Sequence, residues 1–242
     1  MNLQRLFVLS FLLFLFFPAY GGVEPPGGIA KVRAILDKAA HTGDPARWAK
    51  YLIEADAEAE KLARDEAGGC CGLRCVRIGS FTLWYRFNEI EGRENYQHDL
   101  LQTIAQVHEG TPYGADALAL LLPGGCRTIG SAWVPYFRTV LGILETKKWQ
   151  DLHDFRLTRI RAEAYETWWS LSKMTAGDAL VTDWQLDPVD FLEGADLARK
   201  RAIEGYQTLI KTGHSNPDLQ ERLKKIVAGQ DTQMRSWVCY ED

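Results

Sequence analysis

The sequence lacks an apolar run long enough to cross a membrane as a helix. The run near its N-terminus, residues 6–17, contains 12 residues, whereas about 20 are needed to span a hydrocarbon core of roughly 30 Å. Arg5 precedes this run, and Pro18 and Gly21 follow it. This order is typical of a secretory signal peptide at residues 1–21. We expect cleavage after Gly21, with an uncleaved anchor as the alternative.

A large excess of charge of one sign is also missing. The chain has 28 Lys and Arg against 32 Asp and Glu, and because binding to phosphates normally requires a clustered positive surface, this balance argues against a nucleic-acid partner. No cysteine directly follows the apolar run, so we expect no lipid anchor. The mature chain is expected to be periplasmic or secreted, with no stable membrane span. Residues 22–28 form an expected linker, and residues 29–242 an expected folded domain.

The signature motifs of several enzyme classes are absent as well. The sequence contains no Gly-x-Ser-x-Gly elbow, P-loop or Gly-x-Gly-x-x-Gly, which mark acyl-transfer, nucleotide and dinucleotide sites. Two His-Asp pairs, His98-Asp99 and His153-Asp154, could contribute to a metal site of a helical hydrolase, but such a site needs further converging ligands. His98 and His108 are too far apart for one ion, about 15 Å along a helix. We expect neither a metal nor a cofactor.

Cysteine is scarce but present. In an exported chain the cysteines are disulfide candidates, and an odd number allows at most two bridges. The segment CCGLRC holds three thiols, but it lacks the second, separated ligand pair of a usual zinc site. A nucleophilic role for the thiol in GGCRTIGS would need a partnered His and a lowered pKa. Disulfide bonds are favoured over a metal site and over free thiols. The five candidates are Cys70, Cys71, Cys75, Cys126 and Cys239.

Helical signals dominate the rest of the sequence. The clearest helix has Asp44 as its N-cap, Pro45 at its first position, apolar residues at helical spacing and Gly68 as its terminator. In residues 187–213 the helical pattern has a weak point at Gly194, because glycine has a low helix propensity. The segments with helical patterns are 29–40, 44–68, 95–110, 131–148, 149–174, 187–213 and 217–229.

Two segments show an alternating pattern. Residues 80–90 alternate apolar side chains as a strand would, yet the run also suits a buried helix, and periodicity alone does not decide over so short a run. The turn and the helical pattern that follow favour a helix. The tail, residues 231–242, alternates as well and is expected to pack back as an extended segment.

Alignment of the sequence with itself, with residue 102 matched to residue 207, indicates an internal repeat. Pro112 then coincides with Pro217 and Leu118 with Leu223, and Gln-Thr pairs also match. The shift of 105 residues is close to three units of about 35, a period that is typical of helical-pair repeats. The tight turn at GTPYGADALALLL is therefore interpreted as a joint between repeat helices.

At these residues the sequence resembles the tetratricopeptide family, in particular exported members from bacterial envelopes. The family pattern has a bulky and a Leu-type residue in the first helix, which would be Trp84 and Phe87, and Pro112 would open the next repeat. Leu100 and Val107 stand where the family has Ala. The resemblance implies an all-α fold, a right-handed superhelical stack of antiparallel helix pairs. The central stretch, residues 124–187, fits no repeat and would be an irregular insertion.

One stretch is a candidate binding surface. In FRLTRIRAEAYETWWS, the side chains of Arg156, Arg159 and Glu163, with Glu166 and Trp169 beyond them, can lie along one broad face. Arg and Trp are enriched at interface hot spots. The alternative is a long helix with a Trp in the core and its charges in solvent.

Taken together, these patterns favour an exported helical-repeat protein that mediates protein–protein interaction or scaffolding in the cell envelope. The expected partner is a protein or peptide. The alternative is an envelope hydrolase that acts on a cell-wall polymer or peptide, and a third possibility is a structural protein that binds no ligand. A non-catalytic role is favoured because no catalytic residues are singled out.

Overall fold

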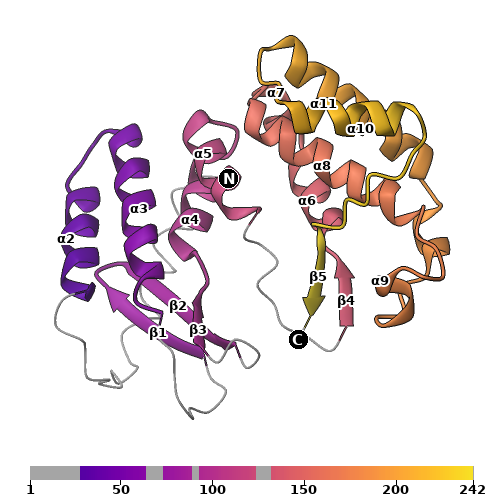
Figure 1. Cartoon of the computed structure of the whole chain (residues 1–242). Helices are drawn as coiled ribbons and strands as arrows, with labels where there is room; N and C mark the ends of the chain where they lie inside the picture. Colours follow the sequence, from indigo (N-terminus) through magenta and orange to yellow (C-terminus); the bar gives the residue numbers. More distant parts are fainter. Residues whose placement is uncertain (1–27, 64–72, 89–92, 124–131, 242) are drawn as a thin grey trace, which may run out of the picture.

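The computed structural model describes residues 28–63, 73–88, 93–123 and 132–241, and most of this part is helical (Figure 1). The α-helices are α2 (Gly28–Ala40), α3 (Pro45–Glu60), α4 (Asp99–Val107), α5 (Pro112–Leu121), α6 (Phe137–Leu144), α7 (Lys147–Asp151), α8 (Phe155–Leu171), α9 (Ala179–Thr182), α10 (Ala195–Lys211) and α11 (Pro217–Val227), with a 3-10 helix η2 (Pro188–Phe191). The strands are β1 (Leu73–Ile78), β2 (Phe81–Asn88), β3 (Arg93–Tyr96), β4 (Ala132–Pro135) and β5 (Val238–Glu241).

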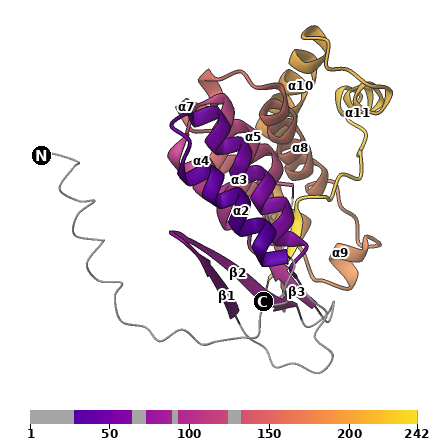
Figure 2. The ribbon, with the colours of Figure 1, turned by 90° about the vertical axis from the view of Figure 1, so that its left-hand side faces the viewer.

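The N-terminal half packs a layer of helices against a small sheet. Helices α2 and α3 form a hairpin, and α3 and α4 contact the antiparallel sheet of order β1-β2-β3 (Figure 2). Leu52, Leu83 and Ile104 are fully buried between these layers. The Tyr85 hydroxyl donates a hydrogen bond of 2.8 Å to the Ala59 carbonyl, which ties the sheet to the end of α3.

The prediction of a helix over residues 80–90 is wrong, because residues 81–88 form strand β2. A two-residue turn at Gly79 and Ser80 joins β1 to β2, with Ile78 opposite Phe81, and Gly79 adopts a positive φ of 60°. Leu83 and Tyr85 are buried while Trp84 is exposed, which is the period-two pattern of a half-buried strand. The fold is therefore mainly helical, as expected, with two small sheets that an all-α class does not include.

The C-terminal half is built around α8. Helices α6 and α10 and the 3-10 helix η2 pack on α8, and α11 packs on α10. Ile160, Ala164 and Trp169 of α8 belong to the apolar core of this half. Helix α5 contributes to both halves, since Ala115 lies in this core and Ala117 lies in the N-terminal one.

The expected single helix over residues 149–174 is divided into α7 and α8. The break lies at His153, which adopts a positive φ of 52°. Asp154 then caps α8, because its carboxylate accepts hydrogen bonds from the backbone N–H groups of Arg156 (2.9 Å) and Leu157 (3.2 Å). The weak point at Gly194 is confirmed: α10 begins directly after this glycine, whose φ is 77°.

The C-terminal tail returns as an extended segment, as expected, and pairs with β4. Val134 lies opposite Cys239 in this antiparallel ladder. The helix expected over residues 131–148 begins only at Phe137. Pro135 explains the late start, since a proline disfavours helical geometry at the residue before it.

The two segments that the sequence alignment paired have similar helix starts at Pro112 and Pro217. Pro112 and Pro217 each occupy the first turn of a helix. The side chain of Thr111 caps α5 through the Gly114 N–H (3.3 Å), and that of Asn216 caps α11 through the equivalent N–H of Leu219 (2.8 Å). Each joint links two helices that pack together, α4 with α5 and α10 with α11.

Candidate functional site

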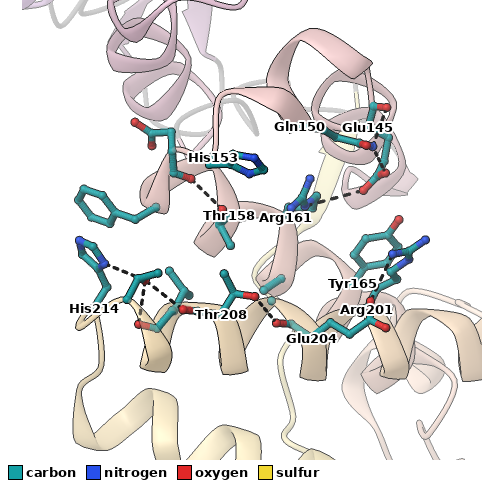
Figure 3. A pocket seen from close by; sticks show the side chains of 16 residues that line it. Glu145, Gln150, His153, Thr158, Arg161, Tyr165, Arg201, Glu204, Thr208 and His214 are labelled. Carbon is teal, nitrogen blue, oxygen red and sulfur yellow. Dashed lines mark hydrogen bonds and ion pairs between the residues drawn. The ribbon is translucent and has the colours of Figure 1, made fainter.

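A groove of about 840 Å³ lies between α8 and α10 and is closed at one side by the α6–α8 connection (Figure 3). We call it the α8–α10 groove. Its size is in the range of pockets that hold ligands. It is lined by Glu145, Gln150, His153, Asp154, Phe155, Thr158, Arg161, Ala162, Tyr165, Arg201, Glu204, Gly205, Thr208, Leu209, Thr212 and His214.

Helical spacing places polar side chains on both walls. On α8, Thr158, Arg161 and Tyr165 are three and four residues apart, so they share one face of the helix. On α10, Glu204 and Thr208 share a face in the same way. Figure 3 shows these two rows facing each other across the opening.

The floor of the α8–α10 groove depends on a glycine. A Cβ atom at Gly205 would lie 2.7 Å from the Ala162 Cβ and 3.5 Å from its Cα. The absence of a side chain on Gly205 therefore lets α10 approach α8 closely. Ala162 and Leu209 are both buried at this level.

One end of the groove is charged. The Arg161 Nε lies 3.9 Å from Glu145 Oε1, and Glu145 Oε2 accepts a hydrogen bond of 2.6 Å from Gln150. Across the groove, Arg201 and Glu204 form an ion pair of 3.2 Å. Burial, and then the charge of Glu145, raise the pKa of Tyr165 to about 12. Two arginines and two glutamates thus make this end nearly neutral overall.

The other end of the groove is aromatic. The rings of Phe155 and His214 stack with centroids 4.0 Å apart and planes 12° apart. His214 Nδ1 is 3.1 Å from the Thr212 hydroxyl oxygen, which fixes the imidazole on α10's C-terminal side. Because Phe155 is 44% exposed, this pair offers an accessible apolar surface.

Asp154 holds the rim of the groove in place. Its carboxylate caps α8 and pairs with Arg156 at 2.7 Å, and Arg156 also reaches Asp116 of α5 at 2.6 Å. Burial alone would raise the pKa of Asp154, but the hydrogen bonds from Arg156 and from the Leu157 N–H lower it overall.

The expected binding strip does not form a single open surface. Arg156 is engaged at the rim, Arg159 pairs with Glu163 at 3.0 Å, and Trp169 is only 2% exposed. Arg156, Arg159 and Glu163 lie on the face of α8 away from the groove-lining row. Trp169 instead contributes to the core, where the Lys173 and Arg199 cations lie over its ring.

Glu163 belongs to a buried charge network that joins three helices. Arg222 of α11 contacts Glu163 at 3.3 Å and donates through Nε to the fully buried Glu166 at 3.0 Å. The Tyr206 hydroxyl donates to Glu166 as well. Burial and the negative charge of Glu166 raise the pKa of Tyr206. Burial lowers the pKa of Arg222, but the hydrogen bond to Glu166 and the neighbouring charges raise it overall.

Both His-Asp pairs mark the beginnings of helices. His98 precedes α4 with a φ of 55°, and its Nδ1 lies 2.6 Å from buried Asp56. Asp99 accepts a hydrogen bond of 2.7 Å from the Trp84 N–H. In the described part of the chain, no three His, Cys, Asp or Glu side chains gather closely enough to hold a metal ion.

The disulfide prediction falls mostly outside the described residues. Cys70, Cys71 and Cys126 lie there, as does the side chain of Cys239. Cys75 is exposed on β1 and forms no disulfide with any residue that the structure describes. Disulfide formation therefore stays a prediction.

Sequence reasoning did not identify the α8–α10 groove, although a signal was present. The polar residues Thr158, Arg161 and Tyr165 repeat at helical spacing, as do Glu204, Thr208 and Thr212. Each row alone is typical of a solvated helix face. Only the packing of α8 on α10 brings the two rows together.

The fold and the groove define a mainly helical protein with a polar ligand-sized groove in its C-terminal half. Comparisons with protein-family models, with curated proteins and with solved structures found no match. Across residues 28–63, 73–88, 93–123 and 132–241, none of the helices has the length and apolar character that a membrane crossing requires.

Proposed function

We propose that this chain is an exported binding protein of the bacterial cell envelope, and that its α8–α10 groove holds an extended segment of a partner protein. The observation that carries the proposal is the groove itself. It is about 840 Å³ in volume, and both of its long walls present hydrogen-bonding side chains. The leader-like residues 1–21 support export.

The lining suits an extended segment. A peptide backbone exposes alternating N–H and C=O groups, which need partners when they leave water. Hydroxyl and charged side chains along α8 and α10, together with the amide of Gln150 in α7, supply both donors and acceptors. At the far end, Phe155 and His214 offer an apolar surface to a side chain of the partner.

We infer that α4–α5 and α10–α11 are two diverged copies of one tetratricopeptide-like helical pair, arranged in a right-handed superhelical stack. The matching N-caps of α5 and α11 and the matching prolines support this relation. Strand β2, however, occupies the position of the first helix of the expected repeat around Trp84 and Phe87.

Site-specific photo-cross-linking in cells tests the binding role. Thr208 lines the groove, whereas its neighbour Gln207 is exposed and does not line it. A photoreactive residue at position 208 should give a discrete product, with the cross-link mapped to one continuous segment of a partner protein. The same residue at position 207 should not give that product. Equal labelling from both positions would contradict the proposal.

A hydrolase that acts on a cell-wall polymer or peptide is the second candidate. It is favoured by two carboxylates, Glu145 and Glu204, that line the same groove from different elements, because paired carboxylates can serve in glycoside hydrolysis. Release of soluble fragments from purified wall material, lost in Glu145→Gln and Glu204→Gln, would support this candidate over the first.

A further inference from the structure

We infer that the segment held in the α8–α10 groove carries both an acidic and a basic side chain. This inference rests on the proposed binding function and specifies the ligand chemistry. It starts from the charged end of the groove, where Arg161 and Arg201 are balanced by Glu145 and Glu204.

The Arg161 guanidinium is engaged incompletely. Its Nε lies 3.9 Å from Glu145 Oε1, which is beyond hydrogen-bonding distance, and it donates no hydrogen bond to a described residue. A guanidinium has five N–H donors in a planar fork that matches a carboxylate. The Arg161 side chain is only 29% exposed, so water satisfies these donors less fully than at an open surface. Arg161 is thus placed to accept an acidic side chain of the ligand.

The glutamates can receive the opposite charge. Glu145 is held by Gln150 at 2.6 Å, which keeps its carboxylate at the groove. Glu204 pairs with Arg201 at 3.2 Å, and both side chains are about half exposed. Exposed pairs of this kind contribute little stability, so a basic side chain of the ligand can compete for Glu204 at small cost.

Charge balance then selects against ligands of a single sign. A purely acidic segment would form ion pairs with the two arginines, but its negative charge would also lie beside Glu145 and Glu204. A purely basic segment would pair with the glutamates, but its positive charge would lie beside the arginines. Like charges brought together in a partly dry groove repel each other, and groove charges that the ligand leaves without a partner lose solvation. A segment with both signs satisfies both sets, and its apolar portion can contact the stacked rings of Phe155 and His214.

Peptide retention tests this inference. The probes are N-acetylated, C-terminally amidated decapeptide libraries, so that only side chains carry charge. Four classes are offered to the purified full-length chain: one Glu with one Lys, two Glu, two Lys, and uncharged. Retained peptides are counted by mass spectrometry. We expect the mixed class to be enriched about ten-fold over either single-sign class, because charge-assisted hydrogen bonds are the stronger ones.

Matched variants assign the preference to the groove. Arg161→Gln should remove the preference for Glu, and Glu204→Gln the preference for Lys. Arg159→Gln, on another face of α8, and Glu221→Gln on α11 should change neither, since these residues do not line the groove. Equal retention of all four classes, or preferences that survive Arg161→Gln and Glu204→Gln, would overturn the inference and leave the binding function standing. Retention of no class at all would overturn both.

Discussion

Glu166 is a carboxylate with no solvent exposure, and its partners explain how the fold accommodates the charge. A buried charge is tolerated when it is paired and hydrogen-bonded. Arg222 supplies the opposite charge and Tyr206 a second donor, so side chains from α8, α10 and α11 all take part. The network therefore fixes how these three helices pack.

Breaking this network on one side should be costly. Glu166→Leu leaves the Arg222 guanidinium, only 16% exposed, without its main acceptor, and we expect a loss of about 3 kcal/mol in the free energy of unfolding. The double variant Glu166→Leu/Arg222→Met removes both charges and should lose less than the single variant. Urea denaturation measures both values. A loss below about 1 kcal/mol for Glu166→Leu would show that the network contributes little.

Asp154 gives the stability of the protein a defined pH dependence. Its pKa in the folded state is lowered, because the hydrogen bonds from Arg156 and Leu157 outweigh the effect of burial. The resulting stabilisation is present above the unfolded pKa of about 3.9 and is lost as pH falls through the lower folded value. Asn retains the capping ability but not the charge. The difference in unfolding free energy between the parent and Asp154→Asn should therefore shrink from pH 7 to pH 3. A difference that is constant over this range would rule out the charge as its source.

At the scale of elements, the sequence predicted those features that local residues determine. Asp44 caps α3 and Pro45 opens it, as expected, because a cap needs only its own neighbours. Strand β2 was missed because its stability depends on pairing with β1, which lies in a cysteine-rich segment with no clear pattern of its own. The break between α7 and α8 was missed because His153 in left-handed geometry has no reliable sequence signal.

The contact between α8 and α10 is an element-scale feature that one glycine controls. Gly205→Ala would place a Cβ atom 2.7 Å from that of Ala162. Despite the higher helix propensity of Ala, we expect a loss of about 1–3 kcal/mol from overpacking. Gly142→Ala in α6 is the matched control, since nothing lies within 4 Å of its Cβ position, and it should be neutral or stabilising. Equal effects of the two substitutions in urea denaturation would argue against a tight contact at Gly205.

At the scale of the whole molecule, the mainly helical class was predictable and the candidate functional groove was not. Arg156, Arg159, Glu163 and Trp169 were expected on one binding face, yet the structure distributes them among a rim, a charge network and the core. The candidate groove instead uses the other face of α8. Helical periodicity ranks faces by polarity, but it does not show which polar face a second helix will enclose.

The most direct test of the binding role compares two adjacent positions of α10. Thr208→Trp places a large side chain in the α8–α10 groove, whereas Gln207→Trp places it on exposed surface outside the groove. Retention of the peptide libraries by each purified variant is measured, with thermal unfolding as the check on folding. We expect Thr208→Trp to lose retention of the peptides and Gln207→Trp to keep it. Equal retention by both folded variants would contradict a binding site in the groove.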